Sequence, residues 1–509
     1  MNQPSPATPP DSVTVELQPL GKRFAIRRGG SLQNILFAEG VEFPCGGRGR
    51  CKGCRVKILS GGLPITESDR RLLTAPELES GWRLACAANP TTNLAIELAQ
   101  WDTPILSDDT VFSFVPSAGL GIAVDLGTTT VVAQLLDLQN GHVLGVRTAL
   151  NPQARHGADI MSRIEFALRS QGQPVLARLI REQIARIVHE LLAESGRSEE
   201  ELQRVVLVGN TAMHHLFCGI DVTPLAGVPF ESENPGLQTF HPEELGWKKT
   251  GHATIQFLPC LGGFVGSDVL AGAVACKIGE ADRLDVLIDL GTNGEIVVGN
   301  REKMFCASTA AGPAFEGAKI SMGMRAASGA ISQVTLANGA LQCRVIGDGP
   351  ARGICGSGLV DAVAAGLQNG AIQPSGRLCG AAFPLLEQVH LTQNDIRELQ
   401  LAKGAIAAGL RILLNRFGAT ANDVHAISLA GAFGNYISRQ SAQRIGLLSF
   451  PIEKIRPAGN TALLGAKLAL FETSVADPAF EQMRARIEHV PLHEDLEFQE
   501  TFIEEMRFP

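Results

Sequence analysis

The chain has 509 residues, enough for about three compact domains and a large buried core. Its 44 basic residues against 52 acidic ones give a formal net charge of -8, which argues against a general nucleic-acid binder, since such proteins carry a basic surplus. No stretch reaches the about 18 consecutive apolar residues that a membrane span needs. The eleven cysteines, many of them scattered singly, favour a reducing cytoplasm over a disulfide framework.

We expect residues 1–11 to form a disordered tail, because they are rich in proline and lack the basic and apolar regions of a secretory signal. The pattern of residues 12–100 predicts a small domain of strands and helices. Two short strands are followed by a helix that begins at Ser31, a strand at RVKILSG, a helical stretch at 65–81 and a last strand at NLAIELA.

Within this domain, PCGGRGRCKGC places Cys45, Cys51 and Cys54 at spacings of five and two residues, and a fourth cysteine, Cys86, follows in GWRLAC. Four thiolates at this spacing suit a [2Fe-2S] cluster, and the glycines let backbone N–H groups turn toward the sulfides. Zinc is the competing metal. Zinc ribbons usually present two CxxC pairs, however, and this chain has only one.

The order of strands, helix and cysteines resembles the β-grasp fold of [2Fe-2S] ferredoxins, in the adrenodoxin and putidaredoxin branch. Basic residues surround the cysteines. These residues are Arg48, Arg50, Lys52, Arg55 and Arg83. Either they form a docking surface for an acidic partner, or they compensate the negative charge of the cluster. A linker is expected at 101–120, where prolines and a glycine interrupt a stretch of mixed character.

Two stretches far apart in the chain repeat one phosphate-loop pattern, GIAVDLGTTTVVAQLLD and VLIDLGTNGEIVVG. In each, a buried strand ends in an aspartate, Asp125 or Asp289, and a turn of small residues leads directly into a second strand. Glycine lets the backbone approach a phosphate, N–H groups and threonine hydroxyls bind it, and an aspartate at the strand end holds Mg²⁺ directly or through water.

The repetition extends beyond these loops. RVVLVGNTAMHH mirrors HAISLAGAFGNYI, and FLPCLGGFVGSDVLAGAVA mirrors IRPAGNTALLGAKLAL. We therefore expect two copies of one α/β unit at 121–282 and 283–475, with the nucleotide between them. Residues 476–509 are expected to add a peripheral helix and an extended tail. The fold class is thus multidomain, with an α+β domain followed by a duplicated α/β domain.

The two copies resemble the halves of the actin, sugar kinase and heat-shock chaperone ATPase superfamily, which are ribonuclease-H-like. By this resemblance Asp125 and Asp289 serve ATP and Mg²⁺, and Glu295 or Glu316 positions the attacking water. The glycines of the CGSG motif serve either phosphate binding at a helix N-terminus or close helix packing. The nucleotide-contacting residues implied are Gly127, Thr128, Thr129, Thr130, Gly291, Thr292, Asn293, Gly294, Gly312, Gly317, Gly356, Ser357, Gly358 and the adenosine-loop residues Gly431, Ala432, Phe433 and Gly434.

Paired histidines, His214 and His215, follow a strand and could suggest a catalytic base. Histidines at a helix start are more often caps or core residues, and we favour that interpretation.

The motifs in their order resemble one family, the reductive activators of corrinoid proteins. The resemblance implies a [2Fe-2S] cluster on Cys45, Cys51, Cys54 and Cys86, with ATP and Mg²⁺ at the repeated loops. It also implies an external electron donor, a homodimer and a corrinoid protein as partner, whose Co(II) cobalamin is reduced to Co(I) for methyl transfer. Neither nucleic acid nor a membrane is expected as a partner.

Three alternatives remain at this level. The chain could activate another low-potential enzyme, as the 2-hydroxyacyl-CoA dehydratase activators do, although those use a different cysteine arrangement. It could be a redox sensor in which the cluster gates an ATP-driven binding switch. A small-molecule kinase is the last alternative, but it leaves the cysteine domain unexplained.

Overall fold

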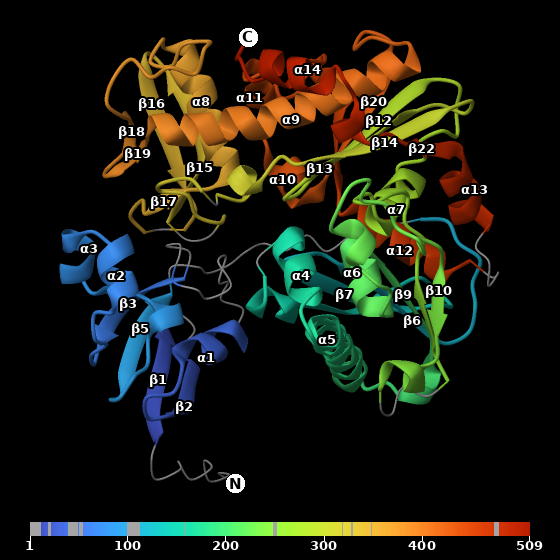
Figure 1. Cartoon of the computed structure of the whole chain (residues 1–509), viewed down its shortest axis with the longest axis horizontal. Helices are drawn as coiled ribbons and strands as arrows, with labels where there is room; N and C mark the ends of the chain where they lie inside the picture. Colours follow the sequence, from blue (N-terminus) through green and yellow to red (C-terminus); the bar gives the residue numbers. More distant parts are fainter. Residues whose placement is uncertain are drawn as a thin grey trace. The chain divides into compact units, whose positions relative to one another are not determined.

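The structure of the chain is a computed structural model and describes residues 12–18, 22–38, 49, 54–98, 112–157, 159–247, 252–317, 319–326, 329–347, 349–472 and 478–509. The chain divides into two compact units, one of residues 1–102 with 152–163 and the other of residues 103–151 with 164–509 (Figure 1). Within the described ranges, none of the helices has the length and apolar character needed to cross a membrane.

The smaller unit is built on a five-stranded mixed sheet in the order β2-β1-β5-β3-β4, in which β1 and β5 run parallel. Alternate residues of β1, Val13, Val15 and Leu17, are buried and join Leu32 and Leu36 of α1 in one core. The predicted β-grasp fold is confirmed. Its elements are β1 (Ser12–Gln18), β2 (Lys22–Arg27), α1 (Leu32–Ala38), β3 (Arg55–Ser60), α2 (Glu67–Leu72), α3 (Ala75–Glu79), β4 (Trp82–Leu84) and β5 (Leu94–Leu98).

The helical stretch expected at 65–81 is two short helices instead of one. Thr66 begins α2 and Thr74 begins α3, and each threonine forms a reciprocal capping box with an acidic residue three positions on, Asp69 or Glu77. A capping box satisfies the free N–H groups of a helix start. Two such boxes eight residues apart in this segment therefore restart the helix.

The larger unit begins with a six-stranded sheet in the order β10-β11-β9-β6-β7-β8. Its central strand β6 is buried along almost its whole length, as expected for a strand covered on both faces. The elements of this half are β6 (Leu120–Leu126), β7 (Thr130–Asp137), β8 (Val143–Leu150), α4 (Ile160–Ala167), α5 (Gly172–Glu194), β9 (Leu202–Gly209), α6 (Thr211–Cys218), β10 (Gln238–Phe240), β11 (Thr254–Phe257) and α7 (Ser267–Ala275).

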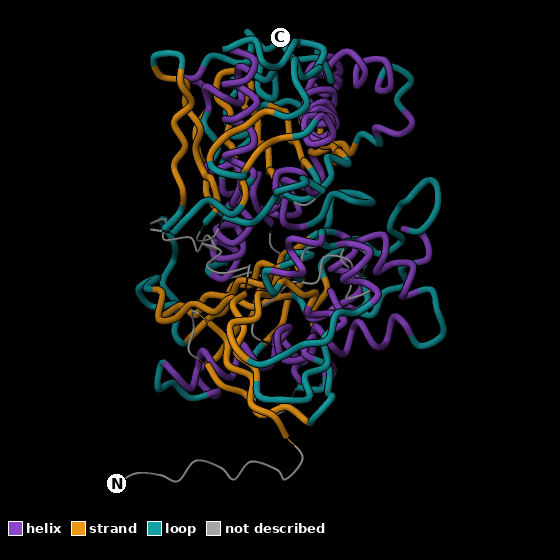
Figure 2. Tube along the Cα trace, turned by 90° about the vertical axis from the view of Figure 1, so that its left-hand side faces the viewer, coloured by secondary structure: helices purple, strands orange, loops and turns teal. Residues whose placement is uncertain are grey.

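The second half carries a six-stranded sheet in the order β21-β20-β12-β13-β14-β22. Figure 2 shows helices (purple) beside strands (orange) in the part of the molecule near the C-terminus. Its elements are β12 (Leu284–Leu290), β13 (Gly294–Gly299), β14 (Met304–Thr309), β15 (Ala330–Ala337), β16 (Ala340–Val345), β17 (Gly353–Ile354), α8 (Gly356–Gln368), β18 (Phe383–Leu386), β19 (Val389–Leu391), α9 (Gln393–Phe417), β20 (Val424–Ala430), α10 (Gly431–Tyr436), α11 (Arg439–Arg444), β21 (Ile455–Gly459) and α12 (Thr461–Leu470).

The two sheets have the same topology over five strands. The order β11-β9-β6-β7-β8 in the first half corresponds to β21-β20-β12-β13-β14 in the second. In both, the first three strands run parallel and the last two pair antiparallel. The predicted duplication is confirmed, and its cause is the repeated order of motifs along the chain.

The halves meet where helices α7 and α12 pack against each other. Small residues allow this close approach: a Cβ added to Gly272 would lie 2.9 Å from the hydroxyl oxygen of Thr461, and one added to Gly465 would collide with the backbone of Ala271. The crossing places the N-termini of both helices beside the ends of the central strands, where the phosphate loops lie.

The chain after residue 477 differs from the peripheral helix that we expected. It forms α13 (Pro478–Arg486), β22 (Ile487–His489) and α14 (Phe498–Glu505), and β22 pairs in parallel with β14 as an edge strand of the second sheet. Arg484 donates through Nε to the carbonyl oxygen of Cys260 at 3.0 Å. Arg486 donates to the carbonyl oxygen of Gly279 at 2.9 Å. The segment therefore ties the second sheet to the end of the first half.

Candidate cluster and nucleotide sites

The structure describes two of the four predicted cluster cysteines, because Cys45 and Cys51 lie outside the described residues. Cys54 directly precedes β3, and Cys86 lies one residue beyond the Ala85 that follows β4. The N–H of Ala85 donates to the carbonyl oxygen of Cys54 at 3.0 Å, so the antiparallel pairing of β3 with β4 brings these two cysteines to one edge of the sheet. Two thiols brought together by one strand pairing fit a thiolate-bound cluster.

Two of the predicted basic residues near the cluster are described, and both interact within their own domain. Arg55 pairs with Glu77 at 3.1 Å and its guanidinium stands over the ring of Trp82. Arg83 donates to the carbonyl oxygens of Leu63 and Trp82, at 3.2 and 2.7 Å. These contacts favour a structural role over a docking surface for both arginines. Arg48, Arg50 and Lys52 lie outside the described residues.

The first phosphate loop is a tight turn between β6 and β7. The N–H of Gly127 donates to the carbonyl oxygen of Thr130 at 2.9 Å, and a Cβ added to Gly127 would lie 2.8 Å from that oxygen, which explains the glycine. The Thr128 hydroxyl accepts a hydrogen bond of 2.9 Å from Asn210 Nδ2. Asn151 Nδ2 donates to the carbonyl oxygen of Gly127 at 3.0 Å. The backbone N–H of Asn151 also donates to the carbonyl oxygen of Thr129. Asn151, which the motifs did not reveal, therefore supports the turn through both its side chain and its backbone.

The second phosphate loop is also a tight turn, between β12 and β13, but here the N–H of Gly291 donates to the carbonyl oxygen two residues on, that of Asn293, at 3.0 Å. The Thr292 hydroxyl donates to Oε1 of Glu316 at 2.6 Å. This bond brings the loop together with the GPAFEG motif. Gly294 is buried at the start of β13 and packs against Ile406 of α9.

Carboxyl groups gather beside these loops, and burial perturbs each of them. It raises the pKa of Asp125 to about 6, and a hydrogen bond from Asn460 opposes the shift. The pKa of Asp289 rises to about 7 through burial and the nearby charge of Asp125. Glu295 lies directly opposite Asp289 in the β12–β13 pairing, and burial raises its pKa well above the usual value. Each side chain keeps part of its surface exposed, as expected for groups that line an accessible site.

Asp268 is a further member of this group that the sequence analysis missed. It lies in the first turn of α7, and its pKa rises to about 7 through burial and then through the charges of Asp289 and Asp125. The repeat contained the signal, because Asp268 lies in the first turn of the helix that matches α12. Within the described residues no group of three His, Cys, Asp or Glu side chains has the arrangement of a metal centre. Mg²⁺ at nucleotide sites usually takes one or two carboxylates with water and phosphate oxygens, so this donor set fits Mg²⁺.

The predicted adenosine loop forms the start of α10 and approaches the second phosphate loop closely. Gly431 adopts φ +82°, and a Cβ there would lie 2.6 Å from Oδ1 of Asp289. The ring of Phe433 stacks on that of Phe315, with centroids 4.6 Å apart. Gly434 packs against Leu429. Ala432 lies in α10, and its side chain is outside what the structure describes.

The two remaining motifs differ in character. Gly312 and Gly317 have φ of +78° and +76° at the two ends of the short helix Pro313–Glu316, which explains the glycines of GPAFEG. In the CGSG motif, a Cβ added to Gly356 would collide with the carbonyl oxygen of Phe315, and one added to Gly358 with that of Ile331. The Ser357 hydroxyl donates to the carbonyl oxygen of Ser332 at 2.9 Å. These contacts favour helix packing for the CGSG residues.

The paired histidines are core residues. His214 and His215 in α6 are fully buried, and burial lowers their pKa values to about 3 and about 4. His214 Nε2 faces the carbonyl oxygen of Gly236 at 3.2 Å, and the Ser232 hydroxyl contacts His215 Nε2 at 2.8 Å. Both rings are therefore neutral, and they connect α6 to the loop at 232–236.

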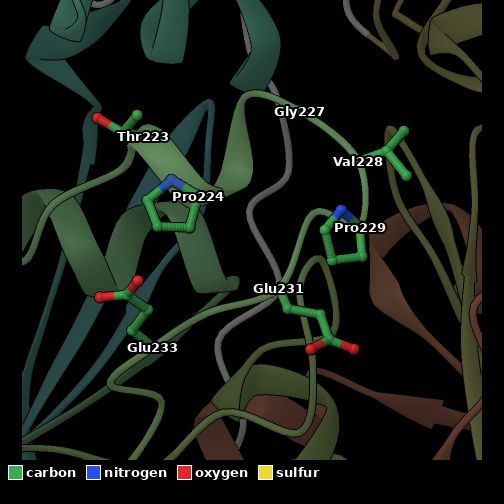
Figure 3. Close-up of a pocket in the computed structure, with 7 residues that line it drawn as sticks. All are labelled: Thr223, Pro224, Gly227, Val228, Pro229, Glu231 and Glu233. Atoms are coloured by element: carbon green, nitrogen blue, oxygen red, sulfur yellow. The ribbon is translucent and has the colours of Figure 1, made fainter.

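A pocket of about 330 Å³ lies in the first half, along residues 223–233 (Figure 3). It is lined by Pro224, Val228 and Pro229 together with Glu231 and Glu233, whose carboxylates point away from each other in the figure. None of the predicted site residues lines this pocket.

Three protein-family models match the chain. Residues 15–91 match a 2Fe-2S iron-sulfur cluster binding domain, residues 120–281 match the RACo middle region, and residues 283–509 match the C-terminal domain of RACo, the ASKHA domain. The matched ranges contain all the predicted cluster cysteines and both phosphate loops.

Relatives and one solved structure extend over most of the chain. It is 35% identical over 437 residues to the corrinoid activation enzyme RamQ of Eubacterium limosum, covering 78% of this chain and 73% of that protein. It is 28% identical over 397 residues to a [Co(II) methylated amine-specific corrinoid protein] reductase of Methanosarcina barkeri, covering 71% and 72%. A solved reductive activator for a corrinoid, iron-sulfur protein matches 98% of each chain with a TM-score of 0.68 and 25% identity.

Proposed function

The chain belongs to the RACo family of reductive activators of corrinoid proteins, and from this premise we propose that it uses ATP to reduce the Co(II) cobalamin of a partner corrinoid protein to Co(I). The observation that carries the proposal is the joint presence of a [2Fe-2S] domain and an ASKHA unit in one chain, with similarity to a corrinoid activation enzyme across both. An activase for another enzyme or a kinase would not need this pairing.

Cys45, Cys51, Cys54 and Cys86 would hold the cluster, which would supply one electron at a potential within the range of iron-sulfur centres, about -700 to +450 mV. Acceptors at lower potential make this transfer unfavourable. ATP can offset the difference only if the protein binds the corrinoid protein more tightly in one nucleotide state than in another. Hinge motion between two rigid halves is an established way to produce such a difference.

Asp125 and Asp289 are the residues that we assign to Mg²⁺. Their pKa values of about 6 and about 7 mean that they hold protons readily in the absence of a cation, and they would release these protons when a divalent cation binds beside them. Asp268 and Glu295 lie in the same group, and together with Glu316 they are our candidates for orienting the attacking water. A raised pKa suits a carboxylate that must accept a proton near neutral pH.

We assign phosphate contacts to the turns that contain Gly127 to Thr130 and Gly291 to Gly294, whose backbone geometry supports this role. The base and ribose would lie along Gly431 to Gly434, with Gly312 and Gly317 shaping the adjacent loop. We propose an external reductant, a homodimer in solution and a cytoplasmic location. The dimer is checked by multi-angle light scattering of the purified full chain.

The decisive experiment mixes the reduced full-length protein and Mg-ATP with a Co(II) corrinoid protein and follows the cobalamin absorbance. Wild type should produce Co(I) only when ATP is present. Cys51→Ala should lose both the cluster absorbance and Co(I) formation, while Cys379→Ala, at an exposed cysteine far from the predicted ligands in sequence, should behave as wild type. Equal Co(I) formation by Cys51→Ala and wild type would overturn the proposal. Binding that depends on cluster oxidation, without any Co(I), would indicate the sensor instead.

A further inference from the structure

The side-chain amide of Asn460 forms hydrogen bonds through both its oxygen and its nitrogen. It is the N-cap of α12 in the second half, where its Oδ1 accepts from the N–H of Leu463 at 2.8 Å. Its Nδ2 donates to Oδ2 of Asp125 at 3.0 Å, across 335 residues of sequence. Asp125 is the last residue but one of β6, the central strand of the first half. One amide therefore joins the start of a helix in one half to the first phosphate loop of the other.

The cap determines which end of this amide faces Asp125. Because the N–H of Leu463 can only donate, the oxygen of Asn460 must point into the helix, and the NH₂ group must point out of it. Asp125 thus always meets a donor. The charge of Asp125 raises the pKa of Asp268 in α7 and of Asp289 in β12, so like charges lie near it. Asn460 is the residue in this group that attracts the Asp125 carboxylate.

We propose that Asn460 is a positioning residue that holds one oxygen of the Asp125 carboxylate, leaves the other oxygen for the cation that accompanies ATP, and so couples α12 to the first phosphate loop. This inference rests on the proposed function, in which Asp125 serves Mg-ATP. It assigns to α12 a role that the phosphate-loop motifs do not contain. α12 packs against β6 and β9 of the first sheet, so the bond fixes this helix to the strand that leads into the first phosphate loop.

Two substitutions separate this role from helix capping. Asn460→Ser keeps a good N-cap but is too short to reach Asp125 and carries no amide. Asn460→Asp also caps the helix, but it places a carboxylate against Asp125. The control is Thr392→Ala, which removes the N-cap of α9 in the same half, where the Thr392 side chain bonds Asp395 of that helix. If Asn460 acted only as a helix cap, both Asn460 variants should keep the stability and turnover of wild type, and only Thr392→Ala should lose stability.

We expect Asn460→Ser to lower kcat for ATP hydrolysis by about tenfold, the effect of one lost hydrogen bond to a charged group, with KM for ATP changed less than about twofold. Asn460→Asp should lower kcat further. Thr392→Ala should lower the melting temperature and leave kcat and KM unchanged. Unchanged kcat in Asn460→Ser would overturn the inference.

A second measurement needs neither ATP nor activity. Hydrogen exchange of the nucleotide-free full chain should become faster at residues 455–470 and 120–137 in Asn460→Asp, because two carboxylates then face each other. The double variant Asn460→Asp with Asp125→Asn exchanges donor and acceptor, and should restore slow exchange in both segments. Absence of that rescue would overturn the inference. If wild type hydrolyses no ATP, the proposed function fails, but the exchange comparison still decides the role of Asn460.

Discussion

The hydroxyl of Thr292 donates a hydrogen bond of 2.6 Å to Oε1 of Glu316. The two residues come from different motifs, the second phosphate loop and the GPAFEG turn. Burial raises the pKa of Glu316, and the bond from Thr292 opposes that shift by favouring the charged form. One hydrogen bond thus connects the phosphate loop to a candidate for water positioning.

Thr292→Val tests this connection, because valine keeps the shape of threonine but cannot donate. Glu316 would lose a donor to its charged form in a buried position, so we expect KM for ATP to rise about tenfold. Thr335→Val, at an exposed position of β15, is the matched control and should leave KM unchanged. Steady-state hydrolysis of Mg-ATP measures both variants. A Thr292→Val enzyme with the KM of wild type would show that the bond has no part in nucleotide binding.

Gly431→Ala should damage the nucleotide site directly. The new Cβ would lie 2.6 Å from Oδ1 of Asp289 and 2.7 Å from the carbonyl oxygen of Leu290, in addition to the strain of φ +82°. Gly418→Ala has the same φ with no atom within 4 Å of its Cβ, so it carries only the backbone cost of about 1–2 kcal/mol.

We therefore expect Gly431→Ala to weaken ATP binding at least about tenfold and Gly418→Ala to bind ATP as wild type does. Calorimetric titration with Mg-ATP measures both affinities. The same affinity in both variants would contradict the close approach of α10 to Asp289.

The carboxyl group of Asp268 makes the stability of the nucleotide-free chain depend on pH. Its pKa is about 7 in the folded chain, against an ordinary value of 3.8. Between about pH 4 and pH 7 the folded state therefore keeps a proton that the unfolded state loses. The free energy of unfolding contributed by this group falls as pH rises through this range. Asp268→Asn removes this loss, and should raise the melting temperature by about 2–4 °C at about pH 8 and change it little at about pH 4.

Scanning calorimetry at both pH values checks this prediction. Asp282→Asn, at an exposed side chain, is the control and should follow wild type at each pH. If Asp268→Asn destabilised the chain equally at both pH values, the perturbed ionisation of Asp268 would be refuted.

Arg484→Gln should weaken the link between the C-terminal segment and the first half. The guanidinium of Arg484 donates to the carbonyl oxygen of Cys260, and glutamine is too short to replace it. We expect a loss of about 1–2 kcal/mol in the free energy of unfolding. Urea unfolding measures the loss, with Arg283→Gln, at a side chain that is 57% exposed, as the control. Equal midpoints for the two variants would argue that the segment adds little to the joining of the halves.

Much of the candidate site was predictable because its motifs are local. Each phosphate loop is a strand, an aspartate, a short turn and a second strand, so Asp125 and Asp289 could be recognised within one continuous stretch. The repeat gave the topology of both halves, since matching motifs in matching order build matching sheets. The C-terminal strand β22 was missed because three residues in an edge strand leave almost no periodic signal.

Taken alone, the sequence determined the chemistry available to this protein: the cysteine spacing, the two Asp-Leu-Gly-Thr turns and the duplication. Only the tertiary structure decided which distant groups meet those turns. Asp268 joins them because α7 and α12 cross at small residues, Asn460 reaches Asp125 across 335 residues, and the CGSG glycines are packed against backbone carbonyls. Contacts of this kind depend on how helices pack in space, and residue spacing along the chain does not encode them.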